Sequence, residues 1–213
     1  MVESNETRMP SKTDDQHREQ MVQLKREQDT KVRERRERKG LIIVNTGDGK
    51  GKSTAAFGLA LRAIGNGMRV GLVQFIKGTW KTGEKQMFAT LDGLDHIEAG
   101  EGFTWNTQDR QRDIAAARAG WEKARAMMEE CRGPIPVYGL LILDELNVAL
   151  RYDHLPIDEV VECLKNKPED LHIAITGRDA HAKLIDVADT VTEMRPVKHA
   201  FNAGIRAQRG IEF

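Results

Sequence analysis

Several residue types that would define a class of protein are scarce in this 213-residue chain. It has only two cysteines, Cys131 and Cys163, too few and too far apart for a disulfide framework or a zinc site, so we expect reduced, half-buried residues on helices. The 33 basic and 33 acidic side chains cancel, which leaves no global positive field to hold nucleic acid. No apolar run approaches membrane-spanning length, and the N-terminus lacks the apolar core of a signal peptide. We therefore expect a cytoplasmic protein with no nucleic-acid partner and no membrane partner.

The first part of the chain differs in composition from the rest. Residues 1–39 are almost all polar and end in the basic cluster 31–39. The pattern is typical of a solvated or frayed helix, with a basic arm for nucleic acid or a helix that orders over a loaded active site as the alternatives. The acidic residues interspersed along the segment weaken the nucleic-acid alternative. We predict a charged helical or flexible segment over 1–39 and one domain over 40–213.

The most informative stretch is 41–56, with the sequence LIIVNTGDGKGKSTAA. A short apolar run predicts a buried strand, and it leads through a glycine-rich loop and a Lys-Ser pair into an alanine-rich helix. Glycines let backbone N–H groups turn inward toward phosphates, and the helix N-terminus adds a favourable field for anions. Lys52 would supply a mobile positive charge to the phosphates, and the Ser53 hydroxyl is suited to Mg²⁺. This stretch predicts a nucleotide-binding P-loop.

The loop departs from the usual P-loop spacing at its first position. The pattern GxxxxGK[ST] places Thr46 where glycine is expected, and Gly47 stands one place later. Lys50 adds a second cation inside the loop. The alternative is a glycine-rich turn in which Gly-Lys-Ser occurs by chance. Such a turn would not require a strand directly before it and a helix directly after it, and both are predicted here, so we favour the P-loop.

The remaining pattern predicts an α/β fold. Short apolar runs alternate with helical patterns, which indicates a mostly parallel sheet covered by helices on both faces. One helix, opened by Asn106 or Thr107, carries a clean apolar stripe that makes Trp121 a core residue. We expect the helix that begins at the P-loop to continue over 55–64, further helices at 156–165 (with Pro156 as the first residue) and 179–187, and strands at 41–44, 70–75, 139–143, 172–176 and 190–194.

Two further features point toward a ligand. The strand at 139–143 closes on Asp144 and Glu145, and downstream of a P-loop such a carboxylate is typical of a Mg²⁺ site. Phe103 and Trp105 flank a threonine on a glycine-rich loop and belong to no helical stripe. They suit a flat apolar ligand, although anchoring of the loop explains them equally well.

The motifs taken together resemble a known family. TGDGKGKSTAAFG, VQFIKGTW, GFTW, LDELN, ITGR and RPVKHAF occur in the order found in the ATP:corrinoid adenosyltransferases of the cob(I)yrinic acid a,c-diamide type. The resemblance runs from about residue 20 to the C-terminus. It implies a P-loop NTPase fold of the RecA-like kind with an N-terminal helical extension, and a homodimer. It also implies transfer of the 5′-deoxyadenosyl group of ATP to Co(I) of a corrinoid, with release of triphosphate.

The same resemblance implies roles for particular residues. Lys50, Lys52 and Glu145 would be catalytic, Ser53 and Glu145 would hold Mg²⁺ or Mn²⁺, and Phe103 and Trp105 would close off the lower face of the corrin. Asn147 stands where some relatives carry threonine, which leaves that contact open. The residues that would bind ATP are Gly47, Asp48, Gly49, Lys50, Gly51, Lys52, Ser53 and Thr54.

The implied chemistry suits these residues. Because the cobalt of the substrate attacks carbon, the triphosphate is the leaving group, and positive charge around it is what catalysis requires. The chain has no flavin or iron–sulfur motif, so the electron donor that makes Co(I) would be external, such as a reduced flavoprotein. The rivals are an ordinary P-loop phosphotransferase or ATPase, and a non-enzymatic nucleotide-dependent binding module tethered by the basic N-terminal segment.

Overall fold

The structure is a computed structural model, and it describes residues 13–76, 83–99 and 109–211. The chain divides into two compact units, Met1–Arg38 and Lys39–Phe213. Among the described residues, none of the helices combines the length and the apolar character needed to cross a membrane. Phe103 and Trp105 lie outside the described residues.

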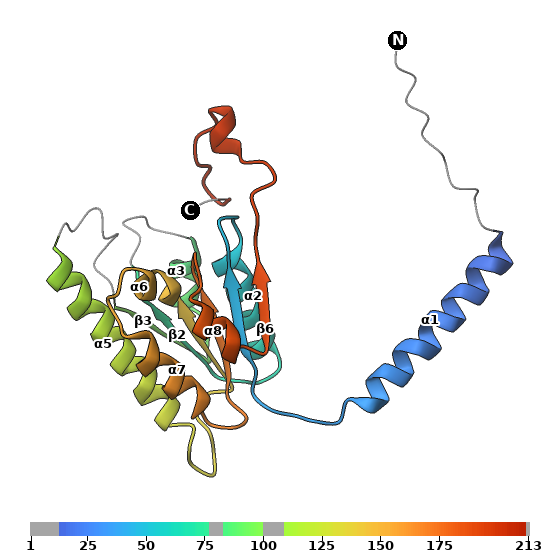
Figure 1. Cartoon of the computed structure of the whole chain (residues 1–213), viewed down its shortest axis with the longest axis horizontal. Coiled ribbons are helices and arrows are strands. Elements are labelled where there is room, and N and C mark those ends of the chain that lie inside the picture. Colours follow the sequence, from blue (N-terminus) through green and yellow to red (C-terminus); the bar gives the residue numbers. More distant parts are fainter. Residues whose placement is uncertain (1–12, 77–82, 100–108, 212–213) are drawn as a thin grey trace. The chain divides into compact units, whose positions relative to one another are not determined.

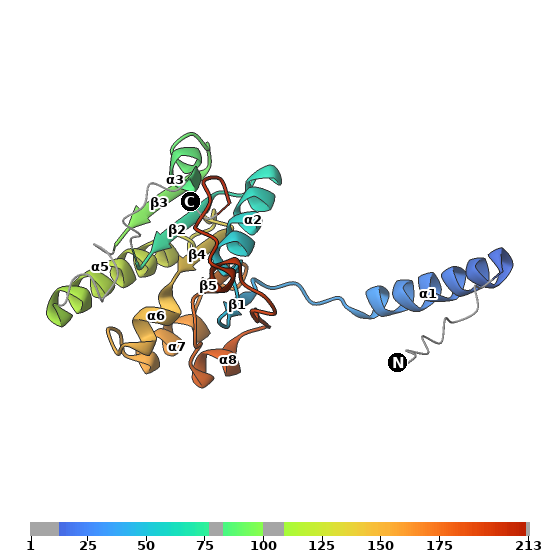
Figure 2. The same ribbon diagram turned by 90° about the horizontal axis from the view of Figure 1, so that it is seen from above.

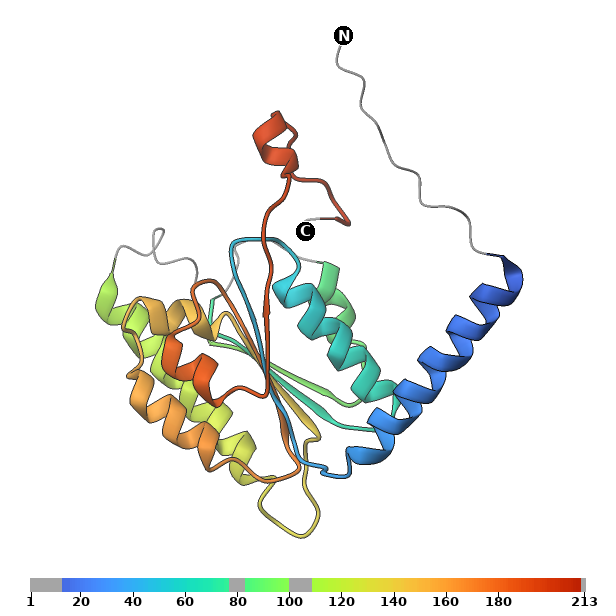
Figure 3. The same cartoon turned by 45° about the vertical axis from the view of Figure 1, so that its right-hand side comes forward.

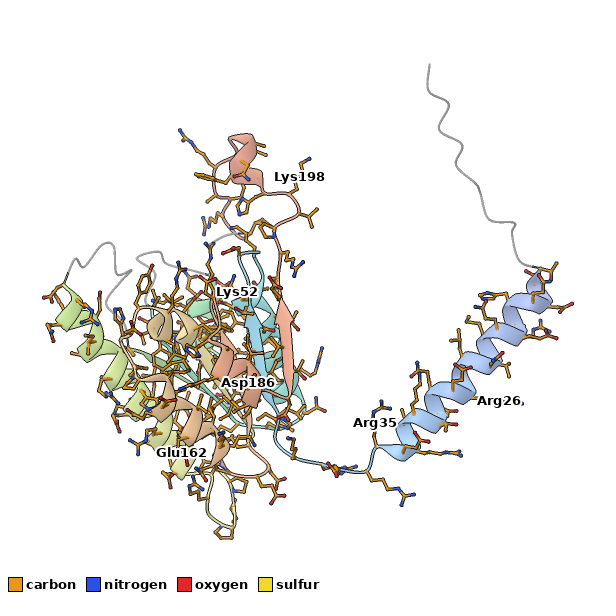
Figure 4. All side chains as sticks on the ribbon, in the orientation of Figure 1. Arg26, Arg35, Lys52, Glu162, Asp186 and Lys198 are labelled. Carbon is orange, nitrogen blue, oxygen red and sulfur yellow. The ribbon has the colours of Figure 1, made fainter. Side chains whose placement is uncertain are left out.

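In the described part of the N-terminal unit, from residue 13 on, the chain forms the helix α1 (Asp14–Glu34). A capping box opens it, because the Thr13 hydroxyl accepts from the Gln16 N–H while the Gln16 side chain accepts from the Thr13 N–H. None of its residues is buried. Figure 4 shows charged side chains along it, such as Arg26, and Arg35 directly after its end. Helix α1 is therefore exposed along its whole length and mostly polar.

The second unit is built on one sheet of six parallel strands (Figures 1 and 3). The strand order is β3-β2-β4-β5-β1-β6, so β5 lies between the strand that precedes the P-loop and the strand that ends in Asp144. This confirms the α/β fold with a parallel sheet. The strands are β1 (Ile42–Thr46), β2 (Val70–Gln74), β3 (Leu94–Glu98), β4 (Leu140–Asp144), β5 (His172–Thr176) and β6 (Thr190–Glu193).

Helices cover both faces of the sheet, as Figure 2 shows from above. One face carries α2 (Lys52–Gly65) and α3 (Gly83–Phe88). The other face carries α5 (Arg110–Glu129), α6 (Leu146–Arg151), α7 (Ile157–Lys165) and α8 (Ala182–Val187). A short 3₁₀ helix, η1 (Ala200–Ala203), follows β6. Each face therefore has its own apolar core.

The larger core confirms the helical stripe read from the sequence. Trp121 on α5 is fully buried, and its indole N–H donates to Glu159 Oε1 at 2.9 Å. Cys131 is buried just after the end of α5, whereas Cys163 is half-buried on α7, and both are free thiols. The expectation that Cys131 would be half-buried on a helix was therefore wrong in detail.

Three helix starts differ from the sequence-based expectation. The N-cap of α5 is Asp109 and not Asn106 or Thr107, because the Asp109 carboxylate accepts from two N–H groups of the first turn. Pro156 is the N-cap of α7 and not its first residue. Asp179 has φ +51°, outside the right-handed helical region, so α8 begins only at Ala182.

Strand β3 was not expected from the sequence. It pairs with β2 in parallel and forms one edge of the sheet, and all five of its residues are only half-buried. Its sequence, LDHIE, contains three polar residues. An edge strand of this kind has no continuous apolar run to mark it.

Candidate active site

The candidate site lies at the carboxyl edge of the three neighbouring strands β1, β5 and β4. The P-loop follows β1, the pair Asp144-Glu145 comes at the end of β4, and the segment Thr176-Gly177-Arg178 comes at the end of β5. Since all strands are parallel, these three segments meet at one edge of the sheet, where ligands of such folds bind. Figure 4 labels Lys52 at this edge.

The P-loop packs tightly against the end of β6. The Gly49 N–H donates to the Met194 carbonyl oxygen at 2.7 Å, and a Cβ added at Gly47 would lie 2.5 Å from the same oxygen. Gly47 and Gly51 have φ values of +91° and +107°, which disfavour any side chain. The glycines of the motif therefore allow the backbone to turn with positive φ and allow the Met194 backbone to approach the loop closely.

Thr46, at the first position of the motif, has a structural explanation. It is the last residue of β1, and its buried hydroxyl accepts from the Ala180 N–H at 3.0 Å. A glycine there would leave that amide without this acceptor. Thr46, the residue that departs from the usual P-loop pattern, thus connects the start of the P-loop to the segment after β5 by a hydrogen bond.

Lys52 is the first residue of α2 and is only 8% exposed. Its ammonium donates to the Gly49 carbonyl oxygen at 2.6 Å, so it closes back over the loop. Burial lowers the pKa of Lys52, and the negative charge of Glu145 opposes that shift. Ser53 and Thr54 follow it in the first turn of α2.

Asp144 ends β4 with its carboxylate buried between two neighbouring strands. Oδ2 accepts from Gln74 Nε2 on β2 at 2.9 Å, and Oδ1 accepts from the Thr176 hydroxyl on β5 at 2.7 Å. Asp144 is 4% exposed. The two hydrogen bonds fix the orientation of this carboxylate.

Glu145 follows in a left-handed backbone conformation, with φ +62° and ψ +21°. Its N–H donates to the Thr176 hydroxyl at 2.9 Å. Burial, together with the neighbouring charge of Asp144, raises the pKa of Glu145 to about 7, while Lys52 and Arg178 act in the opposite direction. Glu145 is thus a half-buried carboxylate that interacts electrostatically with the P-loop lysine, and its charged form is costly without a further cation.

Asn147, whose role the sequence left open, is fully buried in α6. Its Nδ2 donates to the Gly177 carbonyl oxygen at 3.0 Å, and its Oδ1 has no hydrogen-bond partner among the described residues. Gly177 has φ +126°, and a Cβ on it would lie 2.8 Å from Asn147 Cβ and 3.1 Å from Glu145 Oε2. Asn147 therefore holds the turn after β4 against the turn after β5.

Arg178 adds a third cation to the site. Its guanidinium lies 3.8 Å from Asp48 Oδ1 in the P-loop, and its charge acts on both Lys52 and Glu145. Sequence reasoning assigned no role to Arg178, Thr176 or Gln74. The available signal was the position of Thr-Gly-Arg directly after a strand.

The structure brings the P-loop residues 47–54 and Glu145 to one edge of the sheet. Lys50 lies in the loop with an exposed side chain, and Ser53 is half-buried. Phe103 and Trp105, the residues expected to bind the corrin, lie outside the described residues, and their assignment stays a prediction.

Comparison with known proteins agrees with this geometry. Residues 38–213 match the family model described as ATP:corrinoid adenosyltransferase BtuR/CobO/CobP. A corrinoid adenosyltransferase of Pseudomonas aeruginosa is 48% identical over 201 residues, covering 94% of this chain and 97% of the relative. Corrinoid adenosyltransferase CobA of Salmonella typhimurium is 44% identical, covering 94% and 100%. A corrinoid adenosyltransferase of Sinorhizobium sp. is 47% identical, covering 96% and 95%. The chain therefore belongs to the ATP:corrinoid adenosyltransferase family and is a transferase.

Proposed function

We propose that this protein transfers the 5′-deoxyadenosyl group of ATP to the Co(I) centre of a corrinoid and releases intact triphosphate. The observation that carries the proposal is the buried Lys52 of the P-loop, which interacts electrostatically with the half-buried Glu145, within a chain of this family. A lysine with the anion-binding backbone of a P-loop supplies positive charge where phosphates would lie.

The reaction needs no side-chain nucleophile. A cobalt–carbon bond forms as the electron pair of Co(I) attacks the ribose C5′, and the C5′–O bond breaks. That bond's electron pair leaves with the triphosphate, and cobalt is formally oxidised to Co(III). Negative charge grows on the departing oxygen, so donors aimed at the triphosphate lower the barrier. Lys52, with Lys50 and the loop N–H groups, is suited to that task, after the Lys52 ammonium has left the Gly49 carbonyl oxygen.

The residues at this edge also fit a divalent cation. Mg²⁺ prefers oxygen ligands and is commonly held by one or two protein groups together with phosphates and water. Ser53 and Glu145 supply a hydroxyl and a carboxylate, and a cation beside Glu145 would relieve the electrostatic cost that raises its pKa. We assign Ser53 and Glu145 as the protein ligands of Mg²⁺ or Mn²⁺. When bound, the ion would neutralise charge on the triphosphate.

The corrinoid half of the site is assigned to Phe103 and Trp105, on the resemblance of GFTW to the family motif. Two aromatic rings against the lower corrin face would exclude the axial ligand and water, which makes reduction of Co(II) easier. Family membership also supports a homodimer, a cytoplasmic location and an external reductant such as a reduced flavoprotein. The ordered helix α1 agrees with an N-terminal helical extension to the domain.

One experiment separates the proposal from its rivals. The protein is incubated with ATP, Mg²⁺ and chemically reduced corrinoid, while the absorption spectrum follows cobalt and phosphorus NMR follows the phosphates. Adenosylated corrinoid appearing in step with triphosphate is the expected result. ADP and orthophosphate released without corrinoid would favour a phosphotransferase or ATPase, and binding of ATP without any product would favour a binding module.

A further inference from the structure

Thr176 occupies an unusual position between the two acidic residues of the site. Its hydroxyl donates to Asp144 Oδ1 at 2.7 Å and accepts from the Glu145 N–H at 2.9 Å. The residue is 0% exposed and ends β5, between β1 and β4 in the sheet. A single buried hydroxyl therefore links the side chain of Asp144 to the backbone of Glu145.

The backbone of Glu145 requires such a link. A left-handed conformation is disfavoured for a residue with a Cβ, so surrounding contacts must hold it. The conformation lets the chain turn from β4 directly into α6, with Glu145 as the N-cap residue. A Cβ added at Gly177 would lie 3.1 Å from Glu145 Oε2, which places this carboxylate beside the turn that follows Thr176.

The Glu145 N–H sets the donor direction of the Thr176 hydroxyl, because a backbone N–H can only donate and the Thr176 oxygen must accept from it. Gln74 Nε2 donates to Asp144 Oδ2 at 2.9 Å, which leaves Gln74 Oε1 as an acceptor for His96 Nε2 at 2.7 Å. Asp144 therefore accepts one hydrogen bond at each carboxylate oxygen, from Gln74 and from Thr176. Thr176 must then give its proton to Asp144 and keep its lone pair for the Glu145 N–H. The chain of hydrogen bonds runs across β3, β2, β4 and β5.

We propose that Thr176 is a positioning residue that holds Glu145 in the orientation needed to bind a divalent cation with ATP, and that Gln74 supports it through Asp144. The inference rests on the proposed function of Glu145 as a cation ligand. Thr176 is fully buried, and its hydroxyl contacts Asp144 and Glu145. It acts on the carboxylate and not on the substrate.

The test compares two substitutions of the same side chain. Thr176→Val keeps the shape and removes the hydroxyl, whereas Thr176→Ser keeps the hydroxyl. Thr192→Val, at an exposed position on β6, is the matched control. Calorimetry measures ATP binding to the full chain with Mg²⁺ and with EDTA, in the absence of corrinoid, and NMR hydrogen exchange follows the Glu145 amide.

Thr176→Val is expected to weaken Mg²⁺-ATP binding by about tenfold, the usual size for loss of a group that orients a metal ligand. Binding of metal-free ATP should be unchanged, and the Glu145 amide should exchange faster. Thr176→Ser and Thr192→Val should behave like the unmodified chain. Equal binding by the Val and Ser variants, or the same loss with and without Mg²⁺, would overturn the inference.

A second variant keeps the inference testable if Thr176→Val fails to fold. Gln74→Met removes the donor to Asp144 Oδ2 from a residue that is only half-buried. It should weaken Mg²⁺-ATP binding more than metal-free ATP binding, and no difference between the two would overturn the inference. If these binding results hold but no adenosylated corrinoid forms, the proposed function fails while the positioning role stands.

Discussion

Replacement of Glu145 by glutamine should stabilise the free protein while it disables the site. Burial and the charge of Asp144 raise the pKa of Glu145 from 4.5 to about 7, and this value already includes the attraction of Lys52 and Arg178. Each pKa unit corresponds to about 1.36 kcal/mol, so the ionised carboxylate costs the folded state about 3 kcal/mol at pH 8. Glutamine has a similar shape and carries no charge.

The protonation of Glu145 determines in which direction the free energy of unfolding changes with pH. Below pH 4.5 the carboxyl group is protonated in both the folded and the unfolded state, so it contributes no penalty. Between pH 4.5 and about 7 the folded protein retains a proton that the unfolded chain has lost, and stability falls as pH rises. Glu145→Gln should therefore match the unmodified protein near pH 4.5, exceed its free energy of unfolding increasingly up to about pH 7, and keep nearly the full difference at pH 8.

Urea unfolding in EDTA at several pH values measures the difference. Glu169→Gln, at an exposed glutamate before β5, is the control and should show no such trend. Addition of Mg²⁺-ATP should reverse the order, because a ligand stabilises only the form that binds it. A Glu145→Gln protein that is no more stable at pH 8 than at pH 5, relative to the unmodified chain, would refute the electrostatic reasoning.

Three further predictions concern the P-loop and the aromatic loop. Lys52→Ala should keep the fold, since burial already disfavours the charged form of Lys52. It should weaken ATP binding by about 10- to 100-fold, as expected for the loss of a hydrogen bond from a charged group, and calorimetry measures this loss. Near-normal turnover at low ATP would contradict the role. Lys50→Ala should have a smaller effect in the same assay, because its side chain is exposed and its charge is shared with Lys52. Phe103→Ala and Trp105→Ala should fail with Co(II) corrinoid and a mild reductant, yet recover much activity with preformed Co(I). Equal defects in both assays would show that these aromatics position ATP or hold the fold.

The sequence alone determined the features that depend on residues close together in the chain. The apolar run, the glycines and the Lys-Ser pair predicted strand, P-loop and helix in the correct order. The stripe that includes Trp121 predicted one face of α5 and its burial, because helical periodicity is a local property. The acidic pair after an apolar strand likewise predicted that Glu145 would stand at a strand end.

Only the tertiary structure decided how these parts meet. Thr176 lies 32 residues from Asp144 and Gln74 lies 70 residues from it, and their hydrogen bonds exist because β4 sits between β2 and β5. The order of the strands in the sheet cannot be predicted from residues that are close together in the chain. The same holds for Met194, whose carbonyl oxygen meets the P-loop because β6 pairs with β1. The P-loop could thus be read from short-range pattern, whereas the contacts that orient Glu145 depend on which strands are neighbours.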